Sequence, residues 1–142
     1  KDSIWPSSPT EGRTPMSDPS GGAGVPGGLD GLLEEVREFV RERDWSQYHS
    51  PKNLSMALSV EASELVEIFQ WLTEEQSRNL TPAQKAHTAE EIGDVLIYLV
   101  ILADRLGIDP VVAARDKLVL NRIKYPAEKA KGIAPKDDGR DR

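Results

Sequence analysis

The chain has 142 residues, a formal net charge of −6 at pH 7 and no cysteine. Its length suits one domain with a core of its own. The acidic balance argues against a protein that holds nucleic acid on a basic surface, and the lack of cysteine excludes disulfides and thiolate metal sites. The longest apolar run, residues 95–103, is far shorter than the roughly 20 residues that span a bilayer. We therefore expect a soluble, cytoplasmic protein with no nucleic-acid or membrane partner.

Composition divides the chain into three parts. Residues 1–28 hold five of the ten prolines and six of the eleven glycines, which is typical of a linker-like tail. Residues 127–142 are polar and charged without a hydrophobic period. The expected folded domain is therefore residues 29–126, between an N-terminal tail at 1–28 and a C-terminal tail at 127–142.

The hydrophobic period and the helix start and stop signals predict four helices in that domain. They cover residues 29–43, 51–72, 82–107 and 110–126, and residues 44–50 form a loop. Ser50, Thr81 and Asp109 each precede a proline, the order of an N-cap and a first helical residue. No segment alternates with a period of two over enough residues for a strand. The prediction is an all-α fold, a four-helix bundle with short loops.

One charged residue lies where the second helix should be apolar. At 100° per residue, one face of this helix collects the apolar side chains, and Glu61 projects near the centre of that face. Glu64 lies at its edge, and Glu67 has turned toward water. The apolar members of the face are Leu54, Ala57, Leu58, Leu65, Ile68, Phe69 and Leu72. A buried carboxylate without a partner is costly, so Glu61 needs a compensating group.

A second acidic pair, Glu91 and Asp94, repeats the spacing of Glu61 and Glu64 just before the apolar run 95–103. Carboxylates about 5–6 Å apart repel by roughly 3 kcal/mol at an effective dielectric near 20. Four together call for a hard cation, and oxygen ligands without cysteine or clustered histidine favour Mg²⁺ or Mn²⁺. Since Mg²⁺ on carboxylates commonly also binds substrate phosphates, the pattern indicates phosphate chemistry.

Two alternatives compete with this interpretation. Paired glutamates are common on solvated helix faces, so either pair alone is more often structural. A di-iron carboxylate bundle needs Glu-x-x-His on two helices, and neither His49 nor His87 follows a glutamate at that spacing. Both histidines are expected at the surface.

The run 95–103 is apolar almost all round, so it should be covered on every side. Three other helices in so small a domain cannot easily provide that cover. We therefore expect a homo-oligomer, a dimer or a tetramer built as a dimer of dimers, with this helix in the interface.

Further candidates carry positive charge and aromatic rings. Lys117, Asn121 and Lys124 lie close together on the wheel of the fourth helix, and Tyr125 is close by. These residues could bind phosphates and sugar hydroxyls; an ordinary solvated basic face is the alternative. Trp45 and Trp71 flank the second helix. Tryptophan is more often a core residue, but the two could also close on one nucleoside by stacking.

Together these residues resemble the MazG-like, all-α nucleoside triphosphate pyrophosphohydrolases. The signature of that family is Glu-x-x-Glu followed by Glu-x-x-Asp, here Glu61-x-x-Glu64 and Glu91-x-x-Asp94 with 26 residues between them. Flanking matches are DW at 44–45, NL at 53–54, FQW at 69–71, DVLIYLV at 94–100 and K-x-x-x-N-R-x-x-Y-P at 117–126. Within this family, the chain most resembles the dCTP pyrophosphatase subgroup.

The resemblance implies a reaction and a set of roles. Water would attack the α-phosphorus of a nucleoside triphosphate, with Mg²⁺ held by the four acids and Glu61 and Glu64 acting in catalysis. The substrate would be dCTP or a modified dCTP. The implied phosphate or sugar ligands are Lys117, Asn121 and Tyr125, and the implied nucleoside contacts are Trp45, Trp71 and Tyr98.

The resemblance departs from the subgroup at Val36, where its mammalian members carry histidine. We therefore expect a less exclusive preference for cytosine. A catalytically idle helical module that binds a nucleotide or a protein partner is the alternative function. The sequence leaves the base, the sugar, the number of ions and the choice of dimer or tetramer open.

Overall fold

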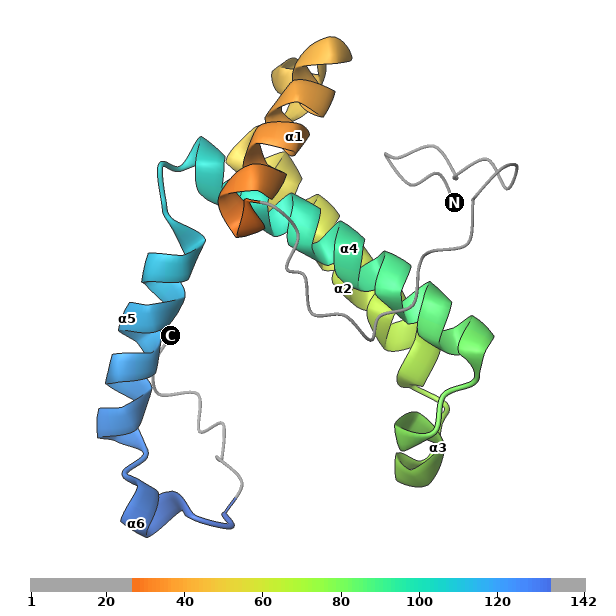
Figure 1. Cartoon of the computed structure of the whole chain (residues 1–142), viewed down its shortest axis with the longest axis vertical. Helices are drawn as coiled ribbons and strands as arrows, with labels where there is room; N and C mark the ends of the chain where they lie inside the picture. The colour runs from red at the N-terminus through yellow and green to blue at the C-terminus, as the bar shows by residue number, and fades with distance from the viewer. Residues whose placement is uncertain (1–26, 134–142) are drawn as a thin grey trace. The chain divides into compact units, whose positions relative to one another are not determined.

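The computed structural model of this chain describes residues 27–133, and every element in that range is helical (Figure 1). The elements are α1 (Gly28–Glu42), the 3₁₀ turn η1 (Trp45–Tyr48), α2 (Pro51–Phe69), α3 (Glu74–Arg78), α4 (Pro82–Arg105), α5 (Pro110–Lys124) and α6 (Ala127–Ala130). The all-α prediction is confirmed, and the four long helices are the four that the sequence predicts. No helix within residues 27–133 has the length and apolar character to cross a membrane.

The described residues separate into two compact units, 27–106 and 107–133. The first contains α1 to α4, and the second contains α5 and α6. The predicted N-terminal tail, 1–28, lies outside the described residues except for its last two. Of the predicted C-terminal tail, only 127–133 is described, and it begins with the short helix α6.

Side-chain caps set the starts of α2, α4 and α5 as predicted, whereas α1 begins after Gly27 without a side-chain cap. Ser50 Oγ accepts a hydrogen bond from the backbone N–H of Asn53 at 3.2 Å, and Asp109 caps α5 in a similar way. At α4, Thr81 and Gln84 form a complete capping box, in which each side chain accepts from the backbone N–H of the other. These bonds satisfy N–H groups that have no partner inside the helix.

Two boundaries differ from the prediction. Helix α2 ends at Phe69 and not at residue 72, because Thr73 and Gln76 form a second capping box that starts α3. The predicted loop 44–50 contains the 3₁₀ turn η1, and Asp44 before it adopts a left-handed backbone with φ of 51°. Neither α3 nor η1 was predicted from the sequence.

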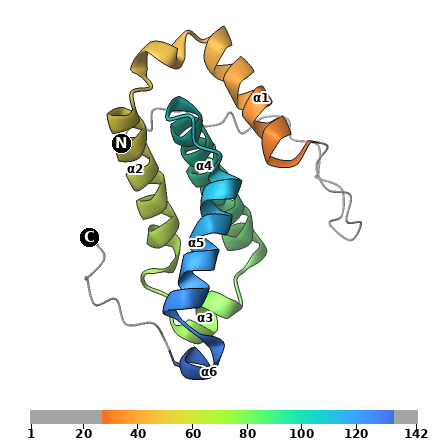
Figure 2. The same cartoon turned by 90° about the vertical axis from the view of Figure 1, so that its left-hand side faces the viewer.

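The core of the first unit lies where α1 meets the pair α2 and α4. The two helices of the pair lie side by side in both views (Figures 1 and 2) and make the most extensive contact between elements. Each of the three helices contributes two buried side chains to the core: Val36 and Val40, Leu54 and Ala57, and Tyr98 and Ile101. Outside the core, Arg37 donates to both carboxylate oxygens of Asp104, which ties α1 to the last turns of α4.

Candidate functional site

Three of the four predicted carboxylates converge where α2 packs against α4. Glu61 and Glu64 come from α2 and Glu91 from α4, and one oxygen from each lies within 4.8 Å of the others. Glu61 is only 3% exposed and Glu91 only 7%. The helical period explains the convergence, because residues three or four apart share one face. We call Glu61, Glu64, Glu91 and Asp94 the acidic cluster.

Asp94 is not one of the three oxygens that lie within 4.8 Å, but its charge acts on the same group. It is half-buried on α4, three residues after Glu91. Glu67, by contrast, is exposed, as the sequence analysis expects.

The electrostatics of the acidic cluster oppose ionisation. Burial first, and then the charges of Asp94, Glu64 and Glu91, raises the pKa of Glu61 from 4.5 to about 7. Burial, followed by the charge of Glu64, also raises the pKa of Glu91 and the pKa of Asp94. These groups are therefore hard to charge together without a cation.

The donor set fits such a cation. Oε2 of Glu91 is buried and has no hydrogen-bond partner, which is unusual for a carboxylate oxygen. A hard divalent cation prefers oxygen ligands, and here three carboxylate oxygens lie within 4.8 Å of one another. The chain has no cysteine that could offer a softer ligand. Glu61, Glu64, Glu91 and Asp94 are the residues that could hold it.

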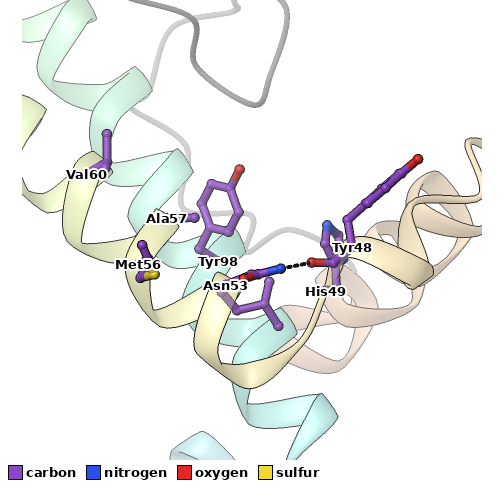
Figure 3. Close-up of a pocket in the computed structure, with 8 residues that line it drawn as sticks. Tyr48, His49, Asn53, Met56, Ala57, Val60 and Tyr98 are labelled. Carbon is purple, nitrogen blue, oxygen red and sulfur yellow. Dashed lines mark hydrogen bonds between the residues drawn. The ribbon is translucent and has the colours of Figure 1, made fainter.

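An apolar cavity of about 500 Å³ is lined by side chains of α2, of α4 and of the segment before α2 (Figure 3). It adjoins the acidic cluster, because Val60 in its wall directly precedes Glu61. Ala57 in its wall is one helical turn before Glu61, and Tyr98 is one turn after Asp94. Its lining residues are Tyr48, His49, Asn53, Leu54, Met56, Ala57, Val60 and Tyr98. Such a cavity has the size and character of a small-molecule pocket.

Part of this wall was not predicted from the sequence. His49 was predicted at the surface, but it is buried, with 8% of its area exposed. Burial lowers the pKa of His49, and the charge of Arg105 lowers it further. A local signal was available: His49 precedes the N-cap Ser50, and residues at that position often pack against the fourth helical residue, here Leu54.

A second, polar cavity of about 390 Å³ lies beyond the acidic cluster, toward the end of α2 and the start of α4. It is lined by Glu64, Glu67, Ile68, Gln84, His87 and Glu91. Nδ1 of His87 lies 3.4 Å from Oε1 of Glu91. The side chain of His87 is exposed, as expected.

The predicted aromatic contacts are not brought together within one chain. Trp45 packs edge-to-face on Phe39, with ring centroids 5.8 Å apart, and against the core. Trp71 is 86% exposed and lies two residues beyond the end of α2. Because α2 has 19 residues, the two tryptophans stand at opposite ends of a helix about 28 Å long. Of the three predicted rings, only Tyr98 lines the apolar cavity.

The predicted phosphate ligands lie in the second unit. Lys117 and Asn121 are one turn apart on α5, and Tyr125 is the residue at its C-terminal end. Nζ of Lys124 lies 5.6 Å from the centre of the Tyr125 ring. The three predicted ligands therefore lie along the second half of α5, and their meeting with the acidic cluster stays a prediction.

An all-helical fold with two acidic pairs facing each other across a helix pair defines a class, and comparison with known proteins identifies it. A model of the MazG-like family matches residues 56–137. The chain belongs to this family, which confirms the resemblance found in the sequence.

The similar proteins are pyrophosphatases by name. The chain is 44% identical over 110 residues to "dCTP pyrophosphatase 1" of Homo sapiens and to its Mus musculus counterpart; each match covers 73% of this chain. The match spans 65% of the length of these curated relatives, just under two thirds. The fold is also similar to the crystal structure of a pyrophosphatase from Archaeoglobus fulgidus DSM 4304, with a TM-score of 0.66 and 42% identity over 69% of this chain and 92% of that one.

The raised pKa of Glu61 predicts how stability depends on pH without metal. Its folded-state pKa, about 7, is above the ordinary value of 4.5, so protonation favours the folded state. This contribution is complete below about pH 4.5 and is lost as the pH rises through 7. The loss is on the order of 3 kcal/mol, and Glu91 and Asp94 act in the same direction.

Chemical denaturation between pH 4.5 and 8 in EDTA measures this dependence. Glu61→Gln should flatten much of the fall in stability, while Glu67→Gln, an exposed change on the same helix, should keep the wild-type slope. Added Mg²⁺ should restore stability above pH 7. Identical slopes for wild type and Glu61→Gln would show that Glu61 titrates normally.

Proposed function

We propose that the chain hydrolyses a nucleoside triphosphate to a nucleoside monophosphate and pyrophosphate in the presence of a divalent cation. The observation that carries this proposal is the acidic cluster, buried carboxylates from two helices with oxygens within 4.8 Å. Buried acids that repel one another lower the stability of the fold, so they indicate a functional role. The pyrophosphatase names of the relatives support the same reaction.

The proposed cation is Mg²⁺, with Mn²⁺ as a substitute, held by Glu61, Glu64, Glu91 and Asp94. When bound, it supplies charge neutralisation for the triphosphate and for the leaving pyrophosphate. The number of ions is left open by these residues.

The proposed chemistry of the chain is to hold and orient the attacking water. An ionised carboxylate of Glu61 or Glu64 accepts a hydrogen bond from the water and takes its proton as the oxygen approaches the α-phosphorus. The new bond joins the water oxygen to the α-phosphorus, and the bond from this phosphorus to the α–β bridging oxygen breaks. Pyrophosphate leaves with the electron pair of that bond.

The apolar cavity is the proposed nucleoside site. It lies one helical turn from Glu61 and Asp94, so a nucleoside there brings its α-phosphate to the carboxylates. Tyr98 lines it, and Trp45 and Trp71 stay predicted contacts. The proposed substrate is dCTP or a 5-substituted dCTP. Since Val36 is buried in the core and cannot hydrogen-bond a base, we expect limited discrimination among pyrimidines.

The proposed assembly is a homo-oligomer, a dimer or a dimer of dimers, in the cytoplasm, with residues 29–126 as the catalytic domain. Its support is an outward apolar row on α4, where Ile92, Leu96 and Leu99 are 52%, 38% and 42% exposed. Residues at this spacing share one face of a helix, and contiguous exposed apolar surface often marks an interface. Lys117, Asn121 and Tyr125 would bind phosphates or sugar in that assembly.

The proposed reaction predicts which products form and which substitution abolishes turnover. With dCTP and Mg²⁺, the products should be dCMP and pyrophosphate, measured by anion-exchange chromatography, and EDTA should stop the reaction reversibly. Glu61→Gln should abolish turnover and leave the helical circular dichroism unchanged. Glu90→Gln, an exposed change beside Glu91, should retain most of the activity. Release of dCDP and orthophosphate would contradict the mechanism, and binding without turnover would indicate an idle module.

Filling the apolar cavity should weaken nucleoside binding. Val60 lines the cavity and is half-exposed, so Val60→Phe adds a ring there without disturbing the core. Because stacking contributes roughly 1–3 kcal/mol per base, KM for dCTP should rise about tenfold or more. Val66→Phe, an exposed change on the same helix outside the cavity, should leave KM unchanged.

The same assay ranks the substrates. We expect kcat/KM to be higher for dCTP than for dTTP and dUTP, and lowest for dATP. A clear dATP preference would contradict assignment to the dCTP subgroup, and equal KM values for the two phenylalanine variants would place the nucleoside elsewhere.

Oligomerisation is tested by light scattering at micromolar concentration. The mass should be about two or four times the 15.7 kDa of one chain, because the apolar row on α4 needs cover. Leu99→Glu should lower the mass by placing a charge in that row. A monodisperse wild-type monomer would refute the proposal.

A further inference from the structure

The polar cavity occupies a definite place in a sequence of sites along the pair α2 and α4. Moving along α2, the apolar cavity ends at Val60, the carboxylates Glu61 and Glu64 follow, and the polar cavity continues to Ile68. Along α4 the same three regions run in the opposite direction. The acidic cluster therefore separates an apolar compartment from a polar one.

The polar cavity contains hydrogen-bond donors as well as acids. The backbone N–H of Thr81 donates to Oε1 of Gln84 at 2.9 Å, which orients the amide so that its NH₂ group faces away from the cap. That group has no partner among residues 27–133. Nδ1 of His87 lies 3.4 Å from Oε1 of Glu91. With Nδ1–H directed at Glu91, Nε2 donates to another partner in the imidazolium form, which carries a proton on both ring nitrogens.

Glu91, which the acidic cluster and the polar cavity share, also indicates a ligand here. It lines the polar cavity, is 7% exposed, and its buried Oε2 has no hydrogen-bond partner. Buried polar atoms are normally satisfied. A bare anion would be repelled by Glu64, Glu67 and Glu91, but the complex of an anion with a divalent cation would satisfy both the acids and the donors.

We infer that the polar cavity binds the β- and γ-phosphates of the substrate, and then pyrophosphate, as a divalent-cation complex, with Gln84 and His87 donating hydrogen bonds to the phosphate oxygens. This inference rests on the proposed function, because a nucleoside in the apolar cavity places the α-phosphate at the acidic cluster. The rest of the triphosphate then extends into the opposite compartment. Gln84 and His87 are thus positioning residues for the leaving group.

Two substitutions remove the donors with little effect on the fold. Gln84→Glu keeps the capping box, since glutamate accepts from the Thr81 backbone as glutamine does, but it replaces the NH₂ donor with a carboxylate oxygen. His87→Ala removes the imidazole from an exposed position. The matched controls are Thr81→Ala, which weakens the cap and retains the amide donor, and Lys85→Ala, an exposed change on the same helix.

Calorimetric titration with pyrophosphate in excess Mg²⁺, and separately with dCMP, measures each half of the site. Gln84→Glu and His87→Ala should each weaken pyrophosphate binding about tenfold, the effect of one hydrogen bond to a charged group. Binding of dCMP should stay at the wild-type value in both. The Thr81→Ala variant should have a lower melting temperature but should bind pyrophosphate as the wild type does. The Lys85→Ala variant should match the wild type in melting temperature and in pyrophosphate binding.

The outcomes separate this inference from the proposed function. Unchanged pyrophosphate binding in both variants, or equal weakening of dCMP, would overturn the inference even in an enzyme that cleaves dCTP. Selective loss of pyrophosphate binding in a protein that releases no pyrophosphate from any nucleotide would uphold the anion site and contradict the proposed reaction.

Discussion

The contact between α2 and α4 depends on one unfavourable arrangement, in which Glu61 and Glu91 are buried beside other acids. Burial and mutual repulsion both disfavour their charged forms, as the raised pKa of Glu61 reflects. The hydrophobic core on the side of Leu54 and Tyr98 holds the helices together despite this cost. The remaining features of the site follow from that arrangement, because the chemistry is confined to the place where the two helices cannot pack as a continuous apolar surface.

The pairing of the two helices also gives the site its direction. Leu54 and Tyr98 are almost fully buried at one end, while Gln84 and His87 line the polar cavity at the other. A nucleoside triphosphate has the same order, with an uncharged aromatic base at one end and a charged diphosphate at the other. The match between the two orders supports the proposed function independently of the names of the relatives.

Most of the fold could be predicted from local patterns. The four long helices begin at Ser50, Thr81 and Asp109 caps or at an apolar period that is visible in the sequence. The missed elements, η1 and α3, are only four and five residues long, too short for a hydrophobic period to develop. The capping box of α3 was a usable signal that pattern reasoning passed over.

The sequence by itself determined the family, the helices and the burial of Glu61, because these depend on spacing along a regular helix. Tertiary structure decided which surfaces meet across helices. It buried His49 against the apolar cavity and separated Trp45 from Trp71 by the length of α2. It also divided the surroundings of the acidic cluster into an apolar and a polar cavity. The physical reason is that helical period fixes the direction of a side chain around its own axis, whereas its neighbours depend on how separate helices pack.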